Sequence, residues 1–305
     1  MLRLKNPSWI NTNLLAKNTV EQFTEDIFIS INQRLESIQS NNPIVSIVIA
    51  AYNEEANVIR CIDSFSQTKT TFPFEIIVVD NNSSDRTAEV LKKLNVKYVF
   101  QKIQGCGIAR QLGMEQAKGK YILTGDADTL YPPQWVNEMM NQLTKPGVVC
   151  VYGRYSFISD EKTPRWKLTL YESFSDLFVL IKAFKRPFLN AYGMTMGYVR
   201  EYALKVGYVD AHIRGEDGRL AFDLMKFGKI KGVLSNKSRV WTGTRTISQD
   251  GSLFSAFKNR LVMALANLGS LFSKQADHDT KTSSNSSADM KENLKTIKKN
   301  FGLGK

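Results

Sequence analysis

Short apolar runs alternate with amphipathic segments four times between residues 43 and 124. The amphipathic segments place apolar residues three and four positions apart, as on one face of a helix. The apolar runs are too short for buried helices and are typical of strands covered on both faces. The pattern predicts an α/β fold with a mostly parallel, Rossmann-like sheet flanked by helices. The predicted strands are 44–50, 75–79, 96–100 and 121–124.

Side-chain caps are expected at the starts of the first two helices. Asn53 precedes the first helix, and Ser83 or Ser84 precedes the second. Later in the chain the alternation is less regular. There the pattern predicts helices at 135–143 and 166–184 and strands at 148–152 and 155–158.

Polar residues follow three of the predicted strands directly. Ligands of open α/β sheets bind at the carboxyl ends of the strands, so these residues are the first candidates for a site. They stand in the segments 50–55, 80–85 and 125–128.

Asp126 and Asp128 are two carboxylates separated by one residue, just past a buried strand. Such a pair can bind Mg²⁺ or Mn²⁺ while phosphates and water fill the other coordination positions. The alternative is a turn that caps the next helix. The acidic ends of the neighbouring strands favour the metal site.

Tyr52 and Asp80 occupy the ends of the first two strands. A carboxylate at this place can accept a hydrogen bond from a nucleobase or a ribose hydroxyl, and a tyrosine ring can face a base. The alternatives are an Asx turn for Asp80 and a core position for Tyr52.

The segment 105–110 begins like a glycine-rich dinucleotide fingerprint, but Arg110 stands where the third glycine should be. It also lies outside the first strand–helix turn. NAD binding is therefore not expected, and the segment is interpreted as a turn that brings Arg110 to a diphosphate.

Glu216 and Asp217 form a second acidic pair before a predicted helix. They can cap that helix, or one of them can act as a general base whose pKa is raised by burial or by its neighbour. The local sequence leaves both readings open.

Four motifs together resemble the family 2 glycosyltransferases of the GT-A fold. They match in order and spacing over about residues 43–245, and 215–217 and 240–245 resemble further segments of that family. The four motifs are Ser46-Ile47-Val48-Ile49-Ala50-Ala51-Tyr52-Asn53-Glu54-Glu55, Val78-Val79-Asp80-Asn81-Asn82-Ser83-Ser84-Asp85-Arg86-Thr87, Gly107-Ile108-Ala109-Arg110-Gln111 and Asp126-Ala127-Asp128.

The resemblance implies inverting transfer of a sugar from a UDP- or GDP-linked donor to a carbohydrate or lipid-linked acceptor in glycan, polysaccharide or glycolipid synthesis. On it, Asp217 is the base, supported by Glu216, and Asp126 and Asp128 bind Mn²⁺ or Mg²⁺. Residues implied in donor binding are Ala51, Tyr52, Glu54, Asp80, Arg110, Asp126, Ala127 and Arg245.

The hydrophobic pattern, the composition and the resemblance together divide the chain. A helical extension is expected over 1–42, a nucleotide-binding half over 43–130 and an acceptor half over 131–250, which together form the GT-A domain 43–250. An amphipathic helix and a basic, partly disordered tail are expected over 251–305.

Two departures from the family pattern bear on the expectation. The segment Thr242-Gly243-Thr244-Arg245-Thr246 lacks the serine and the second arginine of the closest family pattern, which bears on the role implied for Arg245. The other departure concerns the reaction type. The Q-x-x-R-W segment of processive synthases is missing, and no apolar run long enough to span a membrane occurs. Single-sugar transfer is therefore favoured over polymerisation. The alternatives are a sugar-phosphate nucleotidyltransferase and a non-catalytic basic binding protein.

The formal charge of +12 and the three cysteines bear on partners and location. The positive charge is spread over body and tail without a dense block, and acidic strand ends would repel phosphates, so no nucleic-acid partner is expected. Cys61, Cys106 and Cys150 are interpreted as buried thiols in a reducing compartment. The expected location is cytoplasmic, with peripheral contact of 251–305 with the inner membrane face as a further hypothesis.

Overall fold

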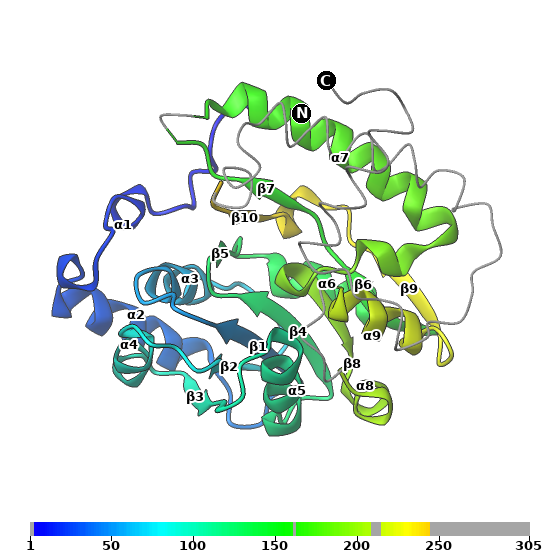
Figure 1. The fold of residues 1–305 in the computed structure, drawn as a ribbon, viewed down its shortest axis with the longest axis horizontal. Helices are drawn as coiled ribbons and strands as arrows, with labels where there is room; N and C mark the ends of the chain where they lie inside the picture. The colour runs from blue at the N-terminus through cyan, green and yellow to red at the C-terminus, as the bar shows by residue number, and fades with distance from the viewer. Residues whose placement is uncertain (1–2, 161–162, 209–214, 245–305) are drawn as a thin grey trace, which may run out of the picture.

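The computed structural model describes residues 3–160, 163–208 and 215–244, and every statement of structure below refers to these ranges. Its main feature is a seven-stranded sheet (Figure 1). The strand order is β3 (Lys97–Phe100), β2 (Phe74–Asp80), β1 (Val45–Ala51), β4 (Tyr121–Asp126), β8 (Met196–Val199), β6 (Val148–Tyr152) and β9 (Lys229–Gly232).

The first four strands of this order are parallel, as the apolar runs predict. Strand β8 is antiparallel to β4 and to β6, and β6 is parallel to β9. The predicted α/β fold with a mostly parallel sheet is therefore confirmed. Strand β8 was not predicted, because the stretch around it carries no periodic pattern or motif.

Helices cover both faces of the sheet because successive strand residues point to opposite sides. Ile47 and Ile49 belong to one core and Val48 to the other. The first core holds side chains of α2 (Glu25–Ile38), α3 (Asn57–Phe65), α4 (Thr87–Lys93) and α6 (Trp135–Leu143). The second holds those of α5 (Cys106–Gln116), α8 (Arg200–Val206) and α9 (Glu216–Leu224).

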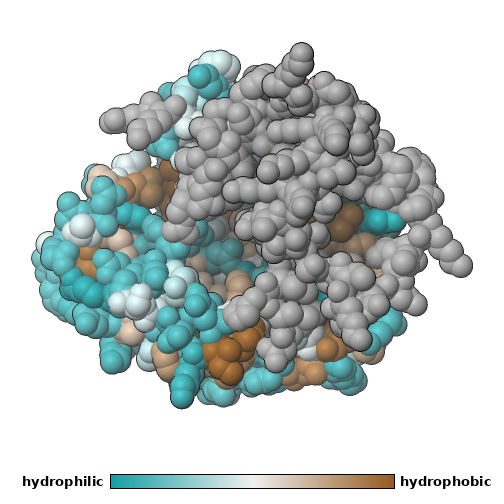
Figure 2. Space-filling model, in the orientation of Figure 1, coloured by the Kyte–Doolittle hydropathy of each residue, from teal (hydrophilic) through white to brown (hydrophobic). Residues whose placement is uncertain are grey.

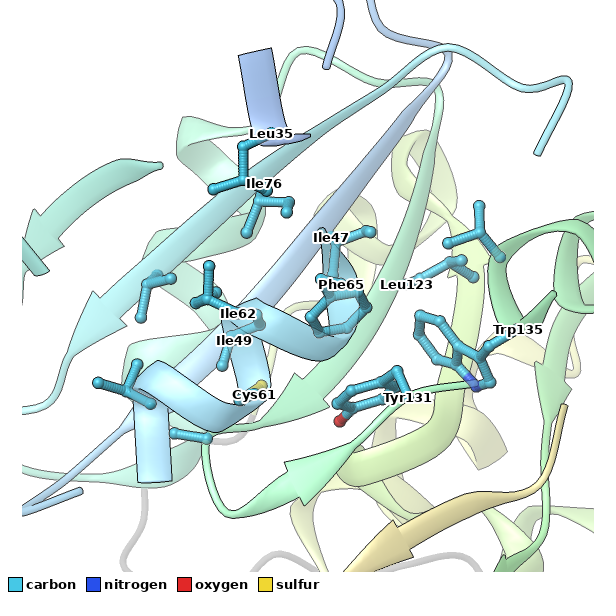
Figure 3. Close-up of a cluster of buried hydrophobic side chains, with 14 of the residues drawn as sticks. Leu35, Ile47, Ile49, Cys61, Ile62, Phe65, Ile76, Leu123, Tyr131 and Trp135 are labelled. Atoms are coloured by element: carbon cyan, nitrogen blue, oxygen red, sulfur yellow. The ribbon is translucent and has the colours of Figure 1, made fainter. Parts of the chain in front are cut away.

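Aromatic rings close the first core next to the end of β4 (Figure 3). Phe65 at the end of α3 stacks on Tyr131, with ring centroids 4.1 Å apart, and Trp135 packs edge-on against both rings. This contact fixes the segment that follows Asp126 and Asp128.

A second sheet of three strands lies beside the first, in the order β5 (Thr129–Leu130), β10 (Val240–Thr242) and β7 (Tyr155–Phe157). Helix α7 (Arg165–Lys185) runs past β7 and β10 along the upper part of the molecule in Figure 1. The remaining short helices are α1 (Thr12–Leu15), η1 (Val20–Gln22), η2 (Pro187–Asn190), η3 (Gly193–Thr195) and η4 (Asn236–Ser238).

Both predicted helix caps are wrong. Helix α3 begins at Asn57 and α4 at Thr87, and neither has a side-chain cap at its start. Asn53 instead has a positive φ of 54° and accepts a 2.8 Å hydrogen bond from the backbone N–H of Ser84. The polar residues assigned as caps therefore join the loops after β1 and β2 to each other.

The N-terminal extension packs on the body of the protein. Ile31 and Leu35 of α2 are fully buried in the first core, and Gln39 forms a bridge with Phe74 of β2. The domain boundary at residue 43 stays a prediction. The segment 251–305 and Arg245 lie outside the described residues, so the predictions for them also stay predictions.

Candidate active site

The ends of three strands meet at one edge of the main sheet. In the register, Ala51 of β1 is opposite Asp80 of β2, and Ala50 is opposite Asp126 of β4. Strands β2 and β3 are added on one side of β1, whereas β4 is added on its other side. The gap between β1 and β4 is therefore the topological switch point, where open α/β sheets bind ligands. The predicted gathering of the strand ends is thus present.

Asp126 and Asp128 are both half-buried, whereas Ala127 between them is 2% exposed. Two hydroxyls fix this segment: the backbone N–H of Asp126 donates to Oη of Tyr131 at 2.9 Å, and Thr242 donates to the carbonyl of Asp128 at 3.3 Å. Both carboxylates are thus partly accessible on a rigid support. Two oxygen donors of this kind fit a hard divalent cation whose other ligands are phosphate and water.

Arg110 joins the end of β4 to the start of α9. Its side chain is 3% exposed, and its guanidinium donates to Asp126 at 2.7 Å, to Asp217 at 2.8 Å and to Glu216 at 3.1 Å. Arginine suits this place because its planar donors can serve several carboxylates at fixed angles. Sequence reasoning did not foresee this cluster, which we call the Arg110 cluster: Arg110, Asp126, Glu216 and Asp217.

The pKa of Asp217 is raised from 3.8 to about 6. Burial is the largest cause, since loss of hydration disfavours the charged form. The neighbouring carboxylates of Glu216 and Asp126 raise the pKa further, and Arg110 partly offsets both. A carboxylate with a pKa near 6 is ionised at neutral pH and can still accept a proton, as a general base must.

Gly193 holds the other side of Asp217. Its backbone N–H donates to Oδ2 of Asp217 at 2.7 Å, while Arg110 binds Oδ1. A β-carbon at Gly193 would overlap the guanidinium of Arg110, so a side chain does not fit there. Sequence reasoning missed Gly193 because it lies in a stretch with no motif, three residues before β8 begins at Met196.

Three further residues expected to bind the donor lie at the ends of β1 and β2: Tyr52 and Glu54 follow β1, and Asp80 ends β2. Tyr52 is 43% exposed, as a ring that faces a base would be. Asp80 is 1% exposed, and one of its oxygens accepts from the backbone N–H of Ser83 at 3.0 Å. Glu54 accepts from the side chain of Asn57 at 2.6 Å. Their roles in donor binding stay predictions.

The loops after β1 and β2 are fastened together by backbone N–H groups and side chains. The N–H of Asn53 donates to Ser83, that of Glu54 to Thr87 and that of Glu55 to Asp85, at 2.9 to 3.2 Å. Held in this way, the rim of the site beside Tyr52 is preorganised.

Asp128 lines a cavity of about 400 Å³ on the side facing α3 and the second sheet. Leu15 and Asn18 of the N-terminal extension form part of its wall, together with Asn57 and Arg60 of α3. Arg60 also donates to the carbonyls of Leu14 and Lys17, which ties the extension to α3. The extension is therefore part of the surroundings of Asp128.

The cysteines differ from expectation at one position. Cys61 and Cys150 are buried, but Cys106 at the start of α5 is exposed. Desolvation of its thiol and three nearby carboxylates raise the pKa of Cys106 to about 12, partly offset by Arg110. Cys106 therefore lies at the edge of the Arg110 cluster without being a reactive nucleophile.

Comparisons with known proteins agree with this geometry. The structure resembles that of the mannosyltransferase PcManGT from Pyrobaculum calidifontis, solved with GDP-Man and Mn²⁺, at a TM-score of 0.54 and 16% identity. The likeness covers 83% of this chain and 77% of that one. The fold is thus that of the GT-A glycosyltransferases.

The family model described as glycosyl transferase family 2 matches residues 46–207, which is more than half of the chain. The protein belongs to this family. The resemblance seen in the four motifs is therefore confirmed.

Curated relatives match over a shorter stretch. Glycosyltransferase AglE of Haloferax volcanii is 32% identical over 125 residues, which is 39% of this chain and 41% of that protein. Chondroitin synthase of Escherichia coli is 32% identical over 125 residues, again 39% of this chain but 18% of that protein. The chain thus matches less than half the length of each of these relatives.

Proposed function

We propose that this protein is an inverting glycosyltransferase that requires Mn²⁺ or Mg²⁺ and moves one sugar from a nucleotide-diphospho-sugar to an acceptor hydroxyl. Membership of family 2 supports the reaction class. The observation that carries the proposal is the Arg110 cluster, in which one buried guanidinium contacts both Asp126 and Asp217. Asp126, the proposed metal ligand on the phosphate side, and Asp217, the proposed base, therefore lie on two sides of the same guanidinium.

The donor would lie over the ends of β1, β2 and β4. Tyr52 would face the base, and Ala51, Glu54 and Asp80 would contact the base or ribose, with Ala127 lining the floor. A UDP- or GDP-linked donor is proposed, and at the level of the fold this agrees with a solved neighbour that holds GDP-Man with Mn²⁺.

Asp126 and Asp128 would hold the cation. When bound, the cation supplies positive charge that offsets the negative charge growing on the departing nucleoside diphosphate. Arg110 holds Asp126 at one oxygen, at 2.7 Å, and so orients the carboxylate.

Asp217 would accept the proton of the acceptor hydroxyl. As the acceptor oxygen forms its bond to the anomeric carbon, the bond from that carbon to the β-phosphate oxygen breaks, and its electron pair leaves with the nucleoside diphosphate. Attack from the face opposite the leaving group inverts the anomeric centre. Glu216 and the N–H of Gly193 would keep Asp217 oriented during the proton transfer.

The acceptor is proposed to be a carbohydrate or a lipid-linked sugar, in glycan, polysaccharide or glycolipid synthesis. A cytoplasmic location is proposed because Cys61, Cys106 and Cys150 are all unpaired thiols.

The test is a panel of nucleotide sugars assayed for transfer or slow hydrolysis with Mn²⁺, with Mg²⁺ and with a chelator. We expect one donor class to turn over only with a divalent cation, and Asp217→Asn to lose turnover while still binding that donor. Full activity of Asp217→Asn would refute the assignment of the base. Turnover unaffected by the chelator would refute the metal.

A further inference from the structure

Helix α7 exposes an apolar stripe along its whole length. The exposed residues recur every three or four positions, so they form one continuous face of the helix. Each of them is between 40% and 86% exposed: Trp166, Leu170, Phe174, Leu177, Leu180, Ile181 and Phe184.

The opposite face of the same helix carries its two carboxylates, which pair with arginines of the protein. Glu172 is 2% exposed and pairs with Arg165 at 2.6 Å, while it also accepts from the backbone N–H of Phe157 in β7. Asp176 pairs with Arg239 at 2.5 Å, next to β10. These contacts fix which face of α7 is turned to the protein.

The inward side of α7 also buries Leu168 and Tyr171, so the helix is apolar on both sides, whereas an ordinary surface helix is polar on the side that faces away from the protein. A continuous apolar face of this length is unusual on a soluble surface, where single exposed apolar residues are normal. The left part of the visible surface in Figure 2, over α1, α2 and α4, is mostly hydrophilic by comparison.

The charges on α7 indicate the partner. Both of its carboxylates face inward, and the exposed lysines Lys167 and Lys185 stand at the two ends of the stripe. An apolar face flanked by cations complements a bilayer with anionic headgroups. A second copy of the chain fits less well, because antiparallel pairing of two α7 helices would bring Lys167 of one copy against Lys185 of the other.

We propose that α7 lies flat in the interface of an anionic phospholipid membrane, with its apolar stripe among the acyl chains. The contact is peripheral: no helix within the described ranges is both long and apolar enough to cross a bilayer. The proposal concerns α7 alone, not the predicted contact of 251–305, and it does not depend on the proposed reaction.

The test is co-sedimentation of the full-length chain with phosphatidylcholine vesicles that contain 0 or about 30% phosphatidylglycerol, a content chosen to give an anionic surface. The test variant is L170Q/L177Q/F184Q, whose three positions are each more than half exposed. The control is I29Q/L204Q/M225Q, which removes exposed apolar side chains from other parts of the surface. Thermal melting of both variants checks that they fold.

We expect wild type and control to bind the anionic vesicles, and the α7 variant to lose at least tenfold in partition. Quenching of Trp166 by brominated lipid, absent in Trp166→Phe, would place the helix itself in the interface. The proposal would be overturned if the α7 variant bound the anionic vesicles as strongly as the wild type. It would also be overturned if the wild-type protein did not bind them. A dimer that is lost in the α7 variant without vesicle binding would assign the face to a second copy.

Discussion

Gly193 and Arg110 occupy adjoining space so closely that a β-carbon on Gly193 would overlap the guanidinium. The same glycine donates its N–H to Asp217. One residue therefore limits where the Arg110 guanidinium can lie and also holds the proposed base. Removing the space at Gly193 should therefore disturb two carboxylate contacts at once.

Gly193→Ala is expected to reduce kcat at least a hundredfold and to lower stability by about 1–3 kcal/mol, as overpacked interiors do. Turnover and urea unfolding measure the two effects. Gly218→Ala is the matched control, since a β-carbon there meets only the carbonyl of Phe188 at 3.4 Å. Alanine also suits a helix interior better than glycine. A Gly193→Ala enzyme with normal kcat would contradict the close packing.

The acid limb of the pH–rate profile should report Asp217. Because its pKa is raised to about 6, protonation below that pH removes the base, and kcat/KM is expected to fall about tenfold per pH unit. Arg110 lowers this pKa, so Arg110→Met should move the limb to higher pH, whereas Arg110→Lys keeps a positive charge and should move it less.

Removing the charge of Arg110 should also cost stability. It leaves three carboxylates without their cation, and loss of one partner of a buried pair costs about 3–5 kcal/mol. Thermal melting at pH 5 and pH 8 tests whether the lost stability comes from the unpaired charges. Protonation of Asp217 at pH 5 removes one of those charges, so the loss of stability should be smaller at pH 5 than at pH 8. An unchanged acid limb in Arg110→Met would show that Asp217 is not the titrating group.

Asp128→Asn should weaken the response to metal. We expect at least a tenfold rise in the Mn²⁺ concentration for half-maximal activity, because an amide is a weaker ligand than a carboxylate for a hard cation. The rise in melting temperature given by UDP or GDP with Mn²⁺ should shrink in parallel. Asp223→Asn is the control, since Asp223 pairs with Arg219 on α9 away from β4. Nucleotide stabilisation of equal size without metal would contradict the site.

Cys106 should react slowly for an exposed thiol. With its pKa near 12 rather than 9, the thiolate fraction at pH 8 is lower by about a thousandfold, and alkylation follows the thiolate. Mass spectrometry after iodoacetamide treatment measures this, with Cys106→Ser as background because Cys61 and Cys150 are buried. Arg110→Met should slow the reaction further, because Arg110 lowers the pKa of Cys106. Rapid labelling at pH 8 would contradict the raised pKa, whose largest cause is desolvation of the thiol.

The sequence predicted the parallel half of the sheet well. Strands β1, β2 and β4 are mostly buried on both faces, so they read as apolar runs, and the residues at their ends carry the motifs that identify the family. Strand β3 is an edge strand that is only partly buried, although its sequence was read in the same way. The sequence was sufficient there because each apolar run and the motif that follows it are contiguous in the chain.

The Arg110 cluster was not predictable in the same way. Arg110, Asp126 and Asp217 were each singled out, but their contact depends on β8 entering the sheet beside β4 and on Gly193 lying under the guanidinium. No periodicity marks β8. The caps at Asn53 and Ser83 failed for a related reason, since their side chains satisfy a neighbouring loop rather than their own helix.

The antiparallel strand β8 has a consequence for folding. Arg110 and Asp217 are 107 residues apart in the chain, and the segment that joins them must seat β8 against β4 before they meet. Long-range closure of this kind is slow relative to local structure. We therefore expect the nucleotide-side half to acquire its structure first and the proposed base to arrive last, so that a newly made chain gains affinity for its donor before it gains turnover.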